Sequence, residues 1–148
     1  FLRAYIYFAL VKRCGGIPYL DKVLSYPAKV SMPEPYLYRD SEEEVWDRIS
    51  EDLDFADNNM YETGLARGHA NRYVAAGIKS RAMLYAGSIA KYNESNHIDP
   101  ETGKRPCGIL EIRATDYFRQ SYQAAKLVEG KYSLYKKQWS AGNLEAQT

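Results

Sequence analysis

Residues 72–91, RYVAAGIKSRAMLYAGSIAK, restrict the fold more than any other stretch, because they predict a helix with two packing faces. One side has apolar residues at helical spacing: Val74, Ile78, Ala82, Tyr85 and Ile89. A second side carries small residues: Ala75, Ala76, Gly77, Ala86, Gly87 and Ala90. Small side chains let helix axes approach closely. We therefore expect this helix to lie between two others.

A second helix is predicted for residues 42–59. Ser41 followed by Glu44 forms a capping-box pattern, and three glutamates in the first turn suit the positive end of the helix dipole. Its apolar stripe consists of Val45, Trp46, Ile49, Leu53, Ala56 and Met60. The carboxylates mostly lie off this stripe and predict a solvated face: Asp47, Glu51, Asp52, Asp54 and Asp57.

Two further helices complete the predicted set. Residues 1–11 carry an expected buried stripe made of Leu2, Tyr5, Ile6, Phe8 and Ala9. Gly15 or Gly16 and then Pro18 end this helix. A helix over residues 115–129 has Phe118, Ser121, Ala125 and Val128 in step and stops at Gly130, and KYSLY after it predicts a short extended piece. The chain is thus predicted to be all-α, with long connections after the first and third helices.

Composition excludes several classes of protein. A chain of 148 residues suits one domain, and a net charge of +1 argues against binding driven by nucleic-acid phosphates. The sequence contains no run of about 18 apolar residues, so no membrane span is predicted. Cys14 and Cys107 are far apart in sequence, and we expect two unlinked thiols. The chain begins inside a predicted helix, so we interpret residues 1–148 as one helical-repeat region of a longer protein.

Four motifs occur in a specific order along almost the whole chain: RAYIYFAL running into GGIPY, SEEEVWDRISEDLDFA, ARGHANRYVAAGIKSRAMLYAG and DYFRQSYQAAKLVEGKYSLY. This order resembles the SusD/RagB family of outer-membrane lipoproteins. His69 stands where that family commonly has an arginine. The resemblance implies tetratricopeptide-like helix pairs stacked in a right-handed scaffold with long irregular loops.

The same resemblance implies a function. Family members bind glycans or other nutrients at the cell surface, partner a TonB-dependent outer-membrane transporter and are not enzymes. No cofactor is implied.

Sugar rings stack on aromatic faces, while their hydroxyl groups need polar partners. The candidates for glycan contact are Tyr19, Tyr26, Tyr36 and Tyr38 in the first long connection, with Trp139 and Asn143 near the end of the chain. The alternative is that these aromatic side chains pack their own loops onto the scaffold or face the transporter.

Other functions have weaker support in the sequence. His69 and His97 are not in a metal-ligand spacing, and no nucleophile or phosphate-loop motif is present. His97, Asp99 and Glu101 form a possible cation site, although a solvated turn explains the same residues. The serious alternative is a helical-repeat scaffold that binds only protein, since it shares the entire fold prediction.

Overall fold

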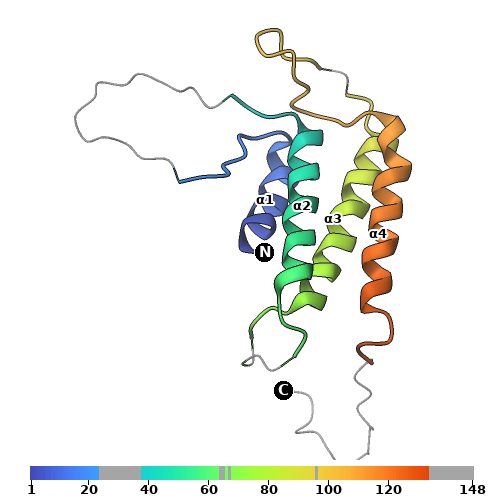
Figure 1. Ribbon diagram of the computed structural model, residues 1–148. Coiled ribbons are helices and arrows are strands. Elements are labelled where there is room, and N and C mark those ends of the chain that lie inside the picture. The colour runs from blue at the N-terminus through green and yellow to red at the C-terminus, as the bar shows by residue number, and fades with distance from the viewer. Residues whose placement is uncertain (24–37, 64–65, 67, 96, 134–148) are drawn as a thin grey trace, which may run out of the picture.

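The computed structural model describes residues 1–23, 38–63, 66, 68–95 and 97–133. It contains the helices α1 (Leu2–Cys14), α2 (Glu42–Asn59), α3 (Arg72–Tyr92) and α4 (Ala114–Val128), with a 3-10 turn η1 (Glu111–Arg113) before α4. Consecutive helices run in opposite directions (Figure 1). The connections after α1 and α3 therefore lie at one end of the bundle and the turn after α2 at the other.

The described residues contain no strand, which confirms the all-α prediction for this part of the chain. Residues 131–133, the described part of KYSLY, do not form a strand. The rest of that motif lies outside the described residues. No helix among the described residues is long and apolar enough to cross a membrane.

The expected position of α3 between two helices is confirmed, since α3 packs against both α2 and α4. Ala75, Ala82 and Ala86 are fully buried. A Cβ built on Gly87 would stand 2.7 Å from the ring of Phe118 in α4, so this glycine permits the close approach. Val74 and Tyr85 from the predicted apolar stripe are each 42% exposed, because the small residues dominate the contact instead.

Helix α2 has the bounds that the sequence predicts, and its capping box is present. Glu44 N donates to Ser41 Oγ at 3.1 Å, and Ser41 N donates to Glu44 Oε2 at 2.8 Å. Val45, Trp46, Ile49 and Leu53 are fully buried, which confirms the predicted stripe.

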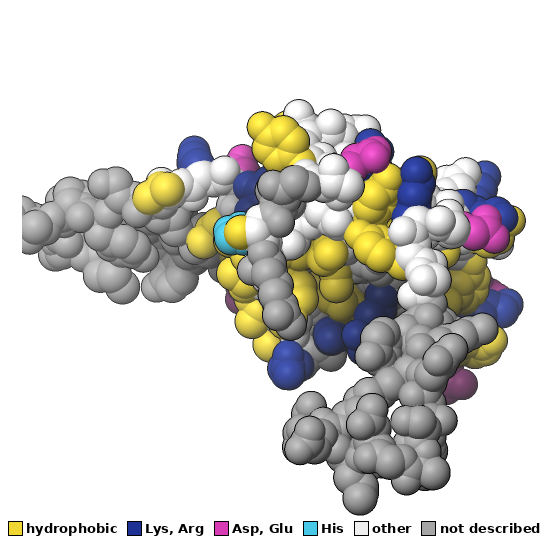
Figure 2. Space-filling view, turned by 90° about the horizontal axis from the view of Figure 1, so that it is seen from below, with side chains coloured by type: hydrophobic (Ala, Val, Ile, Leu, Met, Phe, Trp, Pro, Cys, Tyr) yellow, Lys and Arg dark blue, Asp and Glu magenta, His cyan; other side chains and the backbone are white. Residues whose placement is uncertain are grey.

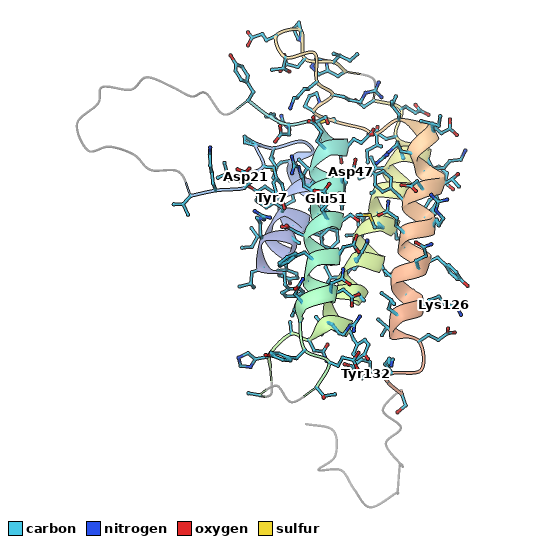
Figure 3. The ribbon with its side chains drawn as sticks, viewed as in Figure 1. Tyr7, Asp21, Asp47, Glu51, Lys126 and Tyr132 are labelled. Carbon is cyan, nitrogen blue, oxygen red and sulfur yellow. The ribbon has the colours of Figure 1, made fainter. Side chains whose placement is uncertain are left out.

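The prediction of a solvated acidic face on α2 is wrong for Asp47, Asp52 and Asp57, which are half-buried, and correct for Glu51 and Asp54, which are exposed. Asp47 pairs with Arg113, Asp52 with Arg3, Asp54 with Lys79 and Asp57 with Arg72. The partners belong to α1 (Arg3), α3 (Arg72 and Lys79) and η1 (Arg113), so these carboxylates tie α2 to its neighbours. Figure 3 labels Asp47 and also Glu51, which is exposed as expected.

The predicted buried stripe of α1 is wrong for Leu2, Tyr5 and Ile6 and correct for Phe8. Leu2, Tyr5 and Ile6 are 71%, 50% and 55% exposed, while the buried residues are Ala4, Phe8 and Val11. This helix has apolar side chains all round, so spacing alone could not select the face that contacts α2.

The stripe of α4 is shifted from the predicted one. Its buried residues are Ala114, Tyr117, Ser121 and Ala124. Of the predicted stripe, Ser121 is buried and Phe118 and Val128 are half-buried, whereas Ala125 is exposed. Hydrogen bonds explain the shift: Tyr117 donates to Asp47 of α2 at 2.7 Å, and Ser121 donates to the carbonyl of Ser80 in α3 at 2.7 Å.

Candidate ligand-binding surface

The two long connections meet at one end of the bundle and form a surface that we call the loop platform, made of residues 15–23, 38–41, 93–95 and 97–110 (Figure 1). Gly16 N donates to the carbonyl of Pro106 at 2.6 Å, and Glu42 N donates to the carbonyl of Arg105 at 3.0 Å. Lys104 Nζ bonds Asp40 at 2.8 Å and Glu44 at 3.1 Å. These bonds join the two connections into one surface.

The glycine pair after α1 makes this junction possible. Gly15 has a φ of 68°, which favours glycine, and a Cβ on Gly16 would stand 2.0 Å from the carbonyl oxygen of Asp40. Buried Glu42 links the second connection to α2. Its carboxylate accepts a hydrogen bond from Trp46 Nε1 at 3.2 Å and another from Gly108 N at 2.6 Å.

One hollow in the platform, the Tyr19 hollow, has a volume of about 230 Å³ and is lined by Tyr19, Asp21, Asp40, Glu44 and Arg48. Tyr19 N donates to Asp40 Oδ2 at 2.8 Å. Three carboxylates and one guanidinium therefore surround the half-buried ring, and such groups suit the hydroxyl groups of a polar ligand.

Residues of α1 and α2 hold the Tyr19 side chain in place. Its hydroxyl donates to Asp52 Oδ2 at 2.6 Å, and its ring lies 4.2 Å from the ring of Tyr7. Arg3 donates to the same carboxylate at 2.6 Å and lies 5.3 Å from the Tyr19 ring centroid. Burial raises the pKa of Tyr19, so its hydroxyl is a neutral donor. Figure 3 shows Tyr7 and Asp21 on this side of the bundle.

The Asp52 carboxylate makes stability depend on pH. Burial alone would raise the pKa of Asp52, but hydrogen bonds from Arg3 and Tyr19 outweigh burial and hold this pKa below its usual value. A lowered pKa in the folded state adds stability above the unfolded pKa and loses it as pH falls through the folded pKa. We expect Asp52→Asn to cost about 1–2 kcal/mol at neutral pH and to weaken the loss of stability in acid.

Thermal unfolding followed by circular dichroism at about pH 7 and about pH 3 measures this effect. Glu51→Gln is the matched control, because Glu51 is exposed and its pair with Arg48 is 3.8 Å long. The control should follow the wild-type pH dependence. An Asp52→Asn protein with the same decline in acid as wild type would contradict the assignment.

A second hollow, the Tyr92 groove, lies where α3 ends and η1 begins. It consists of two adjoining depressions of about 680 and 410 Å³ that share Lys91, Tyr92 and Glu111. Tyr92 is 77% exposed and Ile112 is 85% exposed. An open aromatic ring and an aliphatic side chain thus stand beside polar groups in one groove.

The charged groups in the Tyr92 groove are positioned by each other. Lys91 Nζ donates to Glu111 Oε1, and this bond raises the pKa of Lys91 and lowers the pKa of Glu111. Asn93, Glu94 and Arg105 line the second depression. The groove therefore offers both donors and acceptors around an exposed ring.

The predicted contact residues are placed unevenly. Tyr19 lies in its hollow with its hydroxyl already bonded, and Tyr38 is 60% exposed two residues before Asp40. Tyr26, Tyr36, Trp139 and Asn143 lie outside the described residues. The structure brings Tyr19 and Tyr38 to the same end of the bundle as the Tyr92 groove.

Sequence reasoning missed Tyr92 because it ended the helix at Lys91 and assigned the next residues to a polar surface excursion. The sequence feature that could have indicated it is the position of Tyr92, an aromatic residue directly before the polar residues 93–108. At the possible cation site, the expected turn is present, since Glu101 N donates to Asp99 Oδ1 at 2.9 Å and Gly103 N donates to the Asp99 carbonyl at 2.8 Å. No group of three metal-ligating side chains gathers anywhere in the described ranges.

The described residues thus form an all-α bundle of antiparallel helices whose two long connections join at one end. Two solved structures match it. A SusD-like protein from Bacteroides fragilis NCTC 9343 is 37% identical, matches 60% of this chain and 17% of its own, and gives a TM-score of 0.50. A protein named BT4246 is 25% identical, matches 90% of this chain and 24% of its own, and gives a TM-score of 0.59.

The chain is therefore similar in fold and sequence to a SusD-like protein, which confirms the resemblance carried by its motifs. It spans about a fifth of the length of these two proteins. No family model and no curated protein matches the chain.

Proposed function

We propose that this chain is one helical region of a longer, non-catalytic lipoprotein that binds a glycan or another nutrient at the outer-membrane surface and delivers it to a TonB-dependent transporter. The SusD-like fold supports this function. The observation that carries it is the exposed Tyr92 ring in a groove beside the loop platform, where Lys91 and Glu111 form an ion pair.

The chemistry of the groove fits a carbohydrate. The face of a sugar ring carries C–H groups that stack on an aromatic ring, and its edge carries hydroxyl groups that need donors and acceptors. Tyr92 supplies the exposed ring, while Lys91, Glu111 and Asn93 supply the polar partners. Tyr38 and Tyr19 would extend contact across the platform, and Tyr26, Tyr36, Trp139 and Asn143 remain proposed contacts.

We expect Tyr92→Ala to weaken binding of the recognised polysaccharide by at least about tenfold, the equivalent of about 1.4 kcal/mol. The measurement is calorimetry or affinity electrophoresis of the intact protein against a panel of polysaccharides. Tyr61→Ala is the matched control, because Tyr61 is 75% exposed and lies in the turn at the other end of the bundle. Trp139→Ala tests the sequence-based candidate in the same assay.

The outcomes of this assay distinguish between the Tyr92 groove, the end of the chain and a protein that binds no glycan. If Tyr92→Ala weakens binding and Tyr61→Ala does not, the result supports the Tyr92 groove as the binding site. Binding that survives Tyr92→Ala but fails in Trp139→Ala moves the site to the end of the chain. Failure to bind any glycan or nutrient favours the alternative, a helical scaffold that binds only protein.

A further inference from the structure

The two cysteines of the chain, which the sequence predicts to be unlinked, lie on two segments that join at the loop platform. Cys14 is the last residue of α1, and Cys107 belongs to the second connection; both are exposed and free. A Cβ built on Gly15 would stand 3.2 Å from Cys107 Sγ. Because consecutive Cα atoms are about 3.8 Å apart, Cys14 is one peptide unit away from this contact.

The backbone around the pair is held independently of the sulfur atoms. Gly16 N donates to the Pro106 carbonyl at 2.6 Å, which fixes the residues after Cys14 against the residue before Cys107. Arg39 donates to the carbonyls of both Cys14 and Gly16. A disulfide needs Cα atoms about 4.4–6.8 Å apart, and these contacts hold the segments that carry the two cysteines against each other.

We propose that Cys14 and Cys107 form an intramolecular disulfide that links the end of α1 to the second connection. The oxidant is another disulfide, either of a small thiol or of a protein. One cysteine thiolate attacks this disulfide and releases one reduced thiol, leaving a mixed disulfide on the protein. The second thiolate then displaces the other thiol, so two protein thiols lose two electrons and two protons and the oxidant gains both.

The bond would have a structural consequence for the candidate site. It encloses α2 and α3 in a covalent loop and fixes the junction that supports the loop platform. Closing a loop of this length restricts the unfolded chain, so the oxidised protein should unfold at a higher temperature, by about 5 °C or more. This inference does not depend on the proposed function.

The test uses the purified, reduced protein and oxidised glutathione as the probe. We expect the wild type to lose its reactive thiols at Cys14 and Cys107, remain monomeric on a non-reducing gel and yield a linked peptide containing both residues. Its thermal midpoint should rise on oxidation and fall again after reduction.

Cys14→Ser and Cys107→Ser are the matched variants, and each should retain one reactive thiol and show no rise in midpoint. Both positions are exposed, so these substitutions should leave folding intact. The proposal is overturned if oxidised wild type keeps both thiols reactive, or if its only disulfides join two molecules or join each cysteine to glutathione.

Discussion

We expect Trp46→Ala to lower the free energy of unfolding by about 3–5 kcal/mol. Trp46 is fully buried near the start of α2, where its ring packs edge-on against Phe8 of α1 at a centroid distance of 5.8 Å. Its indole N–H also bonds buried Glu42, which in turn holds Gly108 of the loop platform. Truncation would leave a cavity and remove one of the donors to a buried carboxylate.

Urea unfolding followed by circular dichroism measures this loss. Phe55→Ala is the matched control on the same helix, because Phe55 is 69% exposed and its removal should change stability by about 0.5 kcal/mol or less. Similar losses for the two variants would show that Trp46 does not anchor α1 and α2. Trp46→Phe should fall between them, since it keeps an aromatic ring but loses the N–H donor and part of the buried volume.

The second large effect concerns the contact between α3 and α4. We expect Gly87→Ala to destabilise the protein by about 1–3 kcal/mol, because the added methyl group would stand 2.7 Å from two ring carbons of Phe118. Phe118 is half-buried and must move, or the helices must separate. The intrinsic preference of alanine for helices offsets only about 1 kcal/mol of this cost.

We expect the opposite change in stability for Gly77→Ala on the same helix. Gly77 is exposed, and a Cβ there meets nothing within 4 Å. This substitution should therefore stabilise the protein by about 0.5–1 kcal/mol. The same urea unfolding curves measure both variants, and a stabilised Gly87→Ala protein would contradict the close approach of α3 and α4.

The helices that carry clear local signals could be predicted from sequence. Helix α2 has a capping box, acidic residues in its first turn and one apolar stripe, so its bounds and buried face were both predicted correctly. The close packing of α3 followed from its small residues. In these two helices, local chemistry and tertiary packing favour the same arrangement.

The remaining features depend on partners that a single sequence does not identify. The buried face of α1 was missed because Leu2, Tyr5 and Ile6 are as apolar as the residues that contact α2. The face of α4 is set by hydrogen bonds from Tyr117 and Ser121 to other helices. Likewise, the ion pairs of α2 join residues far apart in sequence.

The candidate site was predicted only in part for the same reason. The sequence indicated aromatic residues in the first connection, and Tyr19 and Tyr38 do lie at the loop platform. The Tyr92 groove needs the end of α3 and the start of η1 side by side, which only the fold provides. The junction between Gly16 and Pro106 is equally invisible in the sequence, although it joins the two connections.

The opposite end of the bundle offers an internal comparison for any binding experiment. Figure 2 views the molecule from that end, where hydrophobic side chains gather beside lysine and arginine side chains. Tyr132 lies there, as Figure 3 shows, and its hydroxyl accepts from Asn71 Nδ2 at 2.8 Å. Exposed aromatic residues thus occur at both ends, but the long connections lie at only one.

Hydrogen–deuterium exchange of the intact protein, with and without the polysaccharide it binds, tests most directly whether the loop platform is the ligand-binding surface. We expect slower exchange on binding in peptides covering residues 38–44 and 97–112, with no change in peptides around Tyr61 and Tyr132. Slower exchange confined to the peptides around Tyr61 and Tyr132, or no change in either region, would contradict it.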